Sequence, residues 1–181
     1  MTKAIEEINF LRQSDYVTAY RRDPDRVWDC LRHRSLDVRI AAVKCLVHFA
    51  TDPIVSQIIT TLATFPSWKN GGTYPAARLL APHISVAQDA ALIDAFPNLA
   101  IRDETAYQIL CQRCPSRKLQ QKLESVLFAA DSDPETCRLA IVSITAVSGP
   151  DQRSLWERCV HHKFKIVSNC AQFYLQQHWT G

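Results

Sequence analysis

Residues 38–49 read VRIAAVKCLVHF, and this stretch shows the pattern that organises the whole chain. Its apolar side chains recur at helical spacing, at Val38, Ala42, Leu46 and Phe49. They therefore share one face of a helix, on which a small residue is followed four positions later by a large one. A small side chain lets a neighbouring helix approach closely, because a large one would hold the two axes apart. The stretch therefore predicts a helix that packs closely against another helix.

The pairing of a small with a large apolar residue recurs five times, with the small residues 30 to 34 positions apart. A second marker, one large apolar residue in a helical segment upstream of each pair, recurs every 30 to 32 positions. The pairs are Ala42/Leu46, Ala76/Leu80, Ala106/Leu110, Ala140/Ile144 and Ala171/Leu175, and the upstream residues are Leu31, Leu62, Ile93, Leu123 and Leu155. Two markers with one period indicate stacked helix pairs, in which no pair can bury its apolar face alone.

Local signals in the rest of the chain also favour helices. Segment 86–96 is expected to form one helix whose apolar face carries Val86, Ala90, Ile93 and Phe96. Three predicted helix starts have a capping side chain: Asp52 before Pro53, Asp133 before Pro134, and Ser85 with Gln88 in a capping box. No period-two run bounded by turn residues predicts a strand, so the chain is predicted to be all-α.

Two segments resemble the second helix of HEAT repeats: SLDVRIAAVKCL (35–46) and SDPETCRLAIVSI (132–144). The first includes the D-x-R pattern at Asp37 and Arg39, which repeats two, three and five lack, so the copies are degenerate and the chain is described as HEAT-like. The resemblance implies a right-handed superhelical solenoid of about five helix pairs, with an N-terminal capping helix. We expect a single domain over residues 1–181, with the capping helix at 2–20 (Ile5, Ile8 and Leu11 on one face) and repeats at about 26–51, 53–82, 85–114, 116–148 and 150–178.

In HEAT-like arrays the second helices line the concave surface, and the helical period predicts which of their residues point there. Counted from each small alanine, the positions two before, two after and six after lie on the far side of the helix. We call these fifteen positions the predicted binding face: Ile40, Lys44, His48, Tyr74, Arg78, Pro82, Glu104, Gln108, Gln112, Arg138, Val142, Ala146, Asn169, Phe173 and Gln177. The N-terminal half of this face is basic and aromatic, and the C-terminal half is apolar. The apolar end either binds a protein partner, or is explained by a bend of the final helix pair or by the terminal segment 176–181 folding over it.

The loop within SWKNGGTYPAARLL (67–80) places a lysine beside two glycines, as a phosphate-binding loop does. Such a loop needs a preceding strand, and the motif GxxxxGK[ST] is not matched, so we interpret the glycines as a helix stop between helices at 54–65 and 75–81. Trp68 in this loop has two interpretations: its ring covers the end of the helix stack, or it is an exposed anchor for a partner. The candidate partner-binding residues are Trp68 and seven members of the predicted binding face: Lys44, Tyr74, Arg78, Gln108, Arg138, Val142 and Phe173.

The sequence predicts neither catalysis nor metal binding. Cys111 and Cys114 form a single C-x-x-C pair, whereas structural zinc typically takes four ligands, and no G-x-S-x-G or H-E-x-x-H motif is present. The seven cysteines are odd in number and follow no signal peptide, so we expect reduced thiols in a cytoplasmic protein without a cofactor. A net charge of +3 is too weak to indicate nucleic-acid binding, and no stretch is long and apolar enough to predict a membrane span.

These observations predict a non-enzymatic module that binds another protein through the concave face and the Trp68 loop. We favour slightly a cytosolic inhibitor, as an immunity protein blocks a toxin or another enzyme, because no other domain is attached. An adaptor or assembly factor is the first alternative. The second is a nucleic-acid-binding protein related to the alkylpurine DNA glycosylases, which use a HEAT-like fold with a basic, aromatic concave face. Lys44, Tyr74 and Arg78 resemble part of that face.

Overall fold

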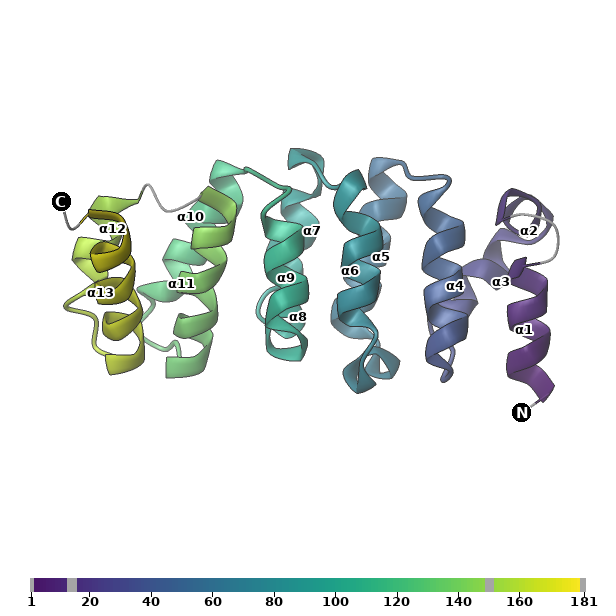
Figure 1. Ribbon diagram of the computed structural model, residues 1–181, viewed down its shortest axis with the longest axis horizontal. Helices are drawn as coiled ribbons and strands as arrows, with labels where there is room; N and C mark the ends of the chain where they lie inside the picture. The colour runs from purple at the N-terminus through teal and green to yellow at the C-terminus, as the bar shows by residue number, and fades with distance from the viewer. Residues whose placement is uncertain (1, 13–15, 149–151, 180–181) are drawn as a thin grey trace.

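The computed structural model describes residues 2–12, 16–148 and 152–179, and within these ranges the chain is all-α, with no strand. Figure 1 shows the helices side by side along the long axis of the molecule, in chain order from α1 to α13. No helix in the described ranges has the length and apolarity needed to cross a lipid bilayer. The elements are α1 (Thr2–Arg12), α2 (Tyr16–Arg22), α3 (Pro24–Cys30), α4 (Leu36–Val47), α5 (Asp52–Thr64), η1 (Pro66–Asn70), α6 (Thr73–Leu80), η2 (Ala81–His83), η3 (Val86–Gln88), α7 (Asp89–Ala95), α8 (Asn98–Arg102), α9 (Glu104–Cys111), α10 (Arg117–Leu127), α11 (Pro134–Ser148), α12 (Arg153–Cys159) and α13 (Lys165–Trp179).

The helices form two rows. In one row α4 contacts α6, α6 contacts α9, α9 contacts α11, and α11 contacts α13. In the other row α5 contacts α7, and α7 contacts α10. Helices of the two rows also pack against each other, as α10 does on α11 and α12 on α13. We refer to α4, α6, α9, α11 and α13 as the second helices, because each follows the other member of its pair in the sequence (Figure 1).

The five small residues of the repeated pattern lie in the hydrophobic core, one on each second helix. Ala42, Ala76, Ala106, Ala140 and Ala171 are each 0% exposed. Of their large partners, Leu46, Leu80, Leu110 and Ile144 are also fully buried, while Leu175 at the end of the row is half-buried. The small side chains thus stand where neighbouring helices approach, as the periodicity predicts.

The upstream marker is buried in four of the five pairs, at Leu31, Leu62, Leu123 and Leu155. In the third pair Ile93 is half-buried, and Leu92 is fully buried instead. The prediction that segment 86–96 forms one helix with Val86 and Ala90 on its apolar face is therefore wrong. Val86 is 55% exposed and Ala90 is also exposed. The segment begins with the short 3₁₀ helix η3 and continues as α7, and because a 3₁₀ turn holds three residues rather than 3.6, the α-helical register is shifted.

Two of the three predicted helix starts are confirmed. The carboxylate of Asp133 accepts hydrogen bonds from the amides of Glu135 and Thr136, both at 2.9 Å. Ser85 and Gln88 form the capping box, here on η3. The prediction for Asp52 is wrong, because Thr51 is the residue before α5 and Asp52 Oδ1 instead accepts a hydrogen bond of 3.0 Å from Gln88 Nε2. Asp52 therefore links two helix pairs rather than capping its own helix.

The N-terminal region differs from the single capping helix predicted at 2–20. It contains two helices, α1 and α2, and residues 13–15 lie outside the described part of the chain. On the predicted apolar face Leu11 is fully buried, Ile8 is half-buried and Ile5 is 52% exposed. Both helices contact α4, so they cover that end of the second-helix row.

The buried alanine row yields a stability prediction. Ala106→Leu adds a bulky side chain at a fully buried helix contact, so we expect the free energy of unfolding to fall by about 1–3 kcal/mol. Urea denaturation followed by circular dichroism measures the change. Ala90→Leu, the same substitution at an exposed position of α7, is the control and should change it by less than about 0.5 kcal/mol. Equal effects of the two substitutions would contradict the close-packing interpretation.

Candidate functional site

The predicted binding face stays accessible along the whole row of second helices. None of its fifteen positions is buried: nine are exposed and six are half-buried. The half-buried members are Ile40, Glu104, Gln108, Arg138, Val142 and Ala146. The helical period therefore identified a continuous accessible surface opposite the alanine core, and its use by a partner stays a prediction.

Arg138 and Glu104 establish how neighbouring second helices are aligned. Arg138 Nη2 on α11 lies 2.7 Å from Glu104 Oε2 on α9, and both residues stand two positions before their buried alanine. Arg138 also pairs with Glu135 at 2.7 Å, and the pKa of Arg138 is raised by these two carboxylates. Glu104 accepts a further hydrogen bond of 3.0 Å from Gln108 Nε2. The centre of the face is thus a polar network in which one arginine is shared by two carboxylates, with one negative charge in excess.

The N-terminal half of the face carries cations that the described residues do not neutralise. Lys44 and Arg78 are exposed and take part in no ion pair within the described ranges. The guanidinium of Arg78 lies over the ring of Tyr74, 5.9 Å from its centroid, and Tyr74 is 40% exposed. This half therefore presents unpaired positive charge beside an aromatic ring.

The C-terminal half of the face contains three apolar positions, at Val142, Ala146 and Phe173, beside polar ones. Phe173 on α13 is 56% exposed and Val142 on α11 is half-buried. Both stand two positions after their buried alanine, and the two helices that carry them are in contact. The suggestion that segment 176–181 folds over them is wrong for residues 176–179, which continue helix α13, and residues 180–181 lie outside the described part.

Trp68 does not belong to this surface. Its side chain is 1% exposed, so the prediction that it is an exposed partner anchor is wrong, and the packing interpretation holds. The guanidinium of Arg39 lies over its ring at 4.9 Å, and Thr73 Oγ1 donates a hydrogen bond of 3.2 Å to its carbonyl. The ring is buried because the loop folds back on the start of α4, where Leu36 lies against Gly72.

Arg39, the arginine of the D-x-R pattern, holds this loop to the first helix pair. It is 2% exposed and donates to the carbonyls of His33 (3.0 Å), Arg34 (2.9 Å) and Gly71 (3.3 Å). Burial lowers the pKa of its guanidinium. Arg102 performs a similar task that the sequence analysis missed, with three hydrogen bonds to the carbonyls of Leu62, Thr64 and Phe65 at the end of α5. No local signal in the sequence marks Arg102, because its partners lie 37 to 40 residues away.

The two glycines of the loop have the left-handed backbone expected of a turn, with φ of 94° at Gly71 and 90° at Gly72. The preceding element is helix α5 followed by η1 rather than a strand. The interpretation of the glycines as a stop between helices is therefore confirmed, and the loop lacks the strand that a P-loop requires.

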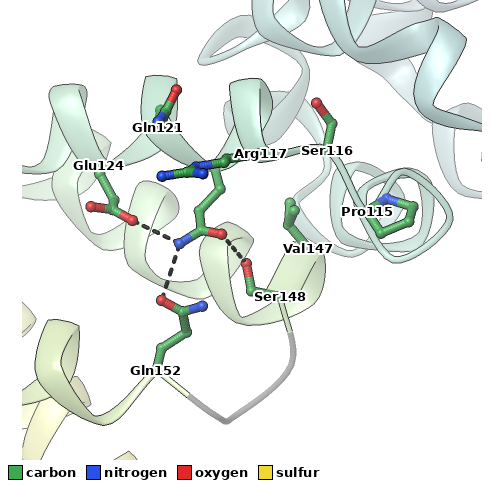
Figure 2. A pocket seen from close by; sticks show the side chains of 9 residues that line it. Pro115, Ser116, Arg117, Gln121, Glu124, Val147, Ser148 and Gln152 are labelled. Atoms are coloured by element: carbon green, nitrogen blue, oxygen red, sulfur yellow. Dashed lines mark hydrogen bonds between the residues drawn. The ribbon is translucent and has the colours of Figure 1, made fainter.

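A polar pocket of about 580 Å³ lies between α10, the end of α11 and the start of α12 (Figure 2). The side-chain amide of Gln120 spans its wall: Nε2 donates to Glu124 (2.8 Å) and Gln152 (3.0 Å), and Oε1 accepts from Ser148 (2.9 Å). The lining is completed by Pro115, Ser116, Arg117, Gln121 and Val147. Among the described residues that line it, Arg117 is cationic and Glu124 is anionic.

The cysteines are structural thiols. Burial raises the pKa of Cys114 to about 11 and raises that of Cys111 further, so the C-x-x-C pair is protonated at neutral pH. Burial and the carboxylate of Glu7, 3.5 Å from Sγ, raise the pKa of Cys30 to about 12. All seven thiols are free, and no cluster of three or more histidine, cysteine or acidic side chains in the described ranges could hold a metal ion.

No protein family model matches the chain, and comparisons with curated proteins and with solved structures give no match either. The resemblance to HEAT repeats therefore rests on the sequence pattern alone.

The loop glycines give a second testable prediction. A Cβ at Gly72 would collide with Leu36 Cδ1, whereas one at Gly71 would meet no atom within 4 Å, and both positions have positive φ. We expect Gly72→Ala to lower the free energy of unfolding by at least about 1 kcal/mol more than Gly71→Ala, since only the former adds a clash to the backbone strain. Urea denaturation of both variants provides the comparison. A larger loss for Gly71→Ala would show that Leu36 does not pack on this loop.

Cysteine reactivity tests the burial of the thiols. Burial raises the pKa of Cys45 and Cys114 to about 11 and that of Cys30 to about 12, so their reactive thiolates form only as the pH approaches these values. At pH 7.5 a thiol reagent should label the native protein slowly, with the half-buried Cys170 first, and should label all seven cysteines quickly in denaturant. Mass spectrometry of the labelled peptides identifies the sites. Fast native labelling of Cys111 or Cys114 would contradict this account.

Proposed function

We propose that this chain is a HEAT-like solenoid of about five helix pairs that binds another protein through the predicted binding face and has no chemistry of its own. Three observations support the repeat arrangement. The second helices contact one another in chain order from α4 to α13, each carries a buried alanine, and Arg138 pairs with Glu104 at the equivalent position of the neighbouring second helix. A right-handed superhelix is the form that the HEAT resemblance implies. We place the protein in the cytoplasm, in keeping with its free thiols.

The observation that carries the proposal is the continuous accessibility of one face across all five second helices, ending in an exposed phenylalanine. A helix face that only contacts water needs no large apolar side chain, whereas aromatic residues are enriched where proteins bind one another. Tyr74 and Phe173 are 40% and 56% exposed near opposite ends of this face. A partner that spans the row would cover both rings.

Among protein-binding roles we favour an inhibitor of the immunity type, which blocks an enzyme or toxin in a one-to-one complex. An adaptor or assembly factor uses the same surface for weaker binding to several proteins. The stoichiometry and the strength of binding therefore separate these two roles. The unpaired cations Lys44 and Arg78 favour one further candidate, which is nucleic-acid binding. The salt dependence of binding separates this candidate from protein binding, because phosphate contacts weaken steeply with salt.

The test is affinity capture from the native lysate, with nuclease treatment and elution in steps of increasing salt, followed by titration of the purified partner. We expect one protein to stay bound at high salt, because apolar contacts are not screened. Phe173→Ala should weaken its affinity about tenfold or more, as loss of an aromatic side chain buried in an interface does. Val86→Ala is the control, because Val86 is 55% exposed but lies on η3, outside the face.

Three results would contradict the proposal. One is an unchanged partner affinity for Phe173→Ala while the variant remains folded. Another is an equal loss for Val86→Ala. The third is recovery of nucleic acid alone, released at moderate salt and lost on Lys44→Glu or Arg78→Glu, because phosphate contacts weaken steeply with salt.

A further inference from the structure

A second pocket, of about 360 Å³, lies outside the second helices that carry the predicted binding face. It is formed by the end of α5, by η1 and by α8, and is lined by Ala63, Thr64, Lys69, Asn98, Ile101 and Arg102. Two of these side chains are cationic and none is acidic. The pocket is therefore a concave site with an unbalanced positive charge.

The charges of Lys69 and Arg102 are not neutralised elsewhere. Neither takes part in an ion pair within the described ranges. Arg102 bonds instead to three carbonyls at the C-terminal end of α5, where the helix dipole amounts to about half a negative charge. Two full positive charges outweigh this partial one. The pocket thus retains a net positive charge that favours an anionic ligand.

The walls of the pocket are held in place before any ligand arrives. Three hydrogen bonds of 2.7–3.2 Å tie the Arg102 guanidinium to α5, and its five donors leave further N–H groups beyond these bonds. The loop that carries Lys69 is tied down by the buried ring of Trp68 and by the bond from Arg39 to Gly71. A prearranged site loses little conformational entropy on binding.

The remaining lining residues define the rest of the ligand. Ile101 is 61% exposed, an uncommon state for a large apolar side chain, and Ala63 lies beside the same space. Asn98 and Thr64 are exposed polar groups at its edge. We propose that this pocket binds a carboxylate carried on a short apolar stem, with Lys69 and Arg102 at its oxygens and Ile101 against the stem. The group can belong to a free small carboxylic acid or to a glutamate side chain of a protein partner.

The test is titration of the ¹⁵N-labelled full-length protein with butyrate, with chloride added to keep the ionic strength constant, followed by two-dimensional NMR. We expect saturable shifts of the amide signals of Lys69, Asn98, Ile101 and Arg102. Butyramide, the neutral analogue, and inorganic phosphate should bind about tenfold more weakly or worse. No saturable shift at these amides would overturn the proposal, as would tighter binding of phosphate or of butyramide.

Lys69→Met removes one charge from an exposed side chain, so the fold should be retained, and we expect butyrate affinity to fall about tenfold. Lys118→Met is the matched control, because Lys118 is an exposed lysine on α10 that does not line the pocket. An equal loss in both variants would show a non-specific charge effect and overturn the proposal. Because the site shares no residue with the predicted binding face, neither result depends on the proposed function.

A further titration, with a peptide, distinguishes the two sources of the carboxylate. In the blocked tripeptide Ac-Leu-Glu-Leu-NH₂ the glutamate side chain is the only charge. Affinity about tenfold above that of butyrate, lost in Lys69→Met, would assign the pocket to an acidic side chain of a protein partner. Affinity equal to or below that of butyrate would assign it to a free small carboxylate.

Discussion

Five alanines, one on each second helix, are fully buried in the core, and their small size permits the close helix packing on which the fold is built. A side chain of one carbon leaves room for the next helix, and a larger one would separate the axes. Once that side of each helix faces its neighbours, helical geometry turns the positions two and six residues away toward solvent. The core and the predicted binding face are therefore two consequences of a single periodic pattern.

Stacked helices also leave carbonyl groups without partners at their ends, and this chain satisfies many of them with cations from the next pair. Arg102 bonds three carbonyls at the end of α5, and Lys163 bonds the carbonyls of Ala129 and Ala130 just beyond α10. Cations at the C-terminal end of a helix also interact favourably with its dipole. A basic side chain in a loop of this protein is therefore often a structural link between pairs. The pocket beside Arg102 is distinct because Lys69 adds a second charge that no such link uses.

The predicted binding face has a graded character that follows from where its charges are paired. At its centre the positive charge of Arg138 is balanced by two carboxylates, Glu104 and Glu135, so that region carries a slight negative excess. Toward the N-terminus Lys44 and Arg78 retain their charge, and toward the C-terminus the surface becomes apolar. A partner that matches this face presents acidic groups at one end and apolar side chains at the other. Such a gradient also defines the orientation in which the two proteins meet.

Helical periodicity, a local property of the amino-acid sequence, was enough to predict the all-α class, the five buried alanines and the accessible side of each second helix. The sequence also distinguished the glycine turn from a phosphate loop. Only the tertiary structure decided that Trp68 is buried, that Asp52 bonds Gln88 of the next pair, and that η3 shifts the register of α7. Each of these outcomes depends on which residues distant in the sequence come to lie against a loop or a helix end. Periodicity carries no information about such contacts.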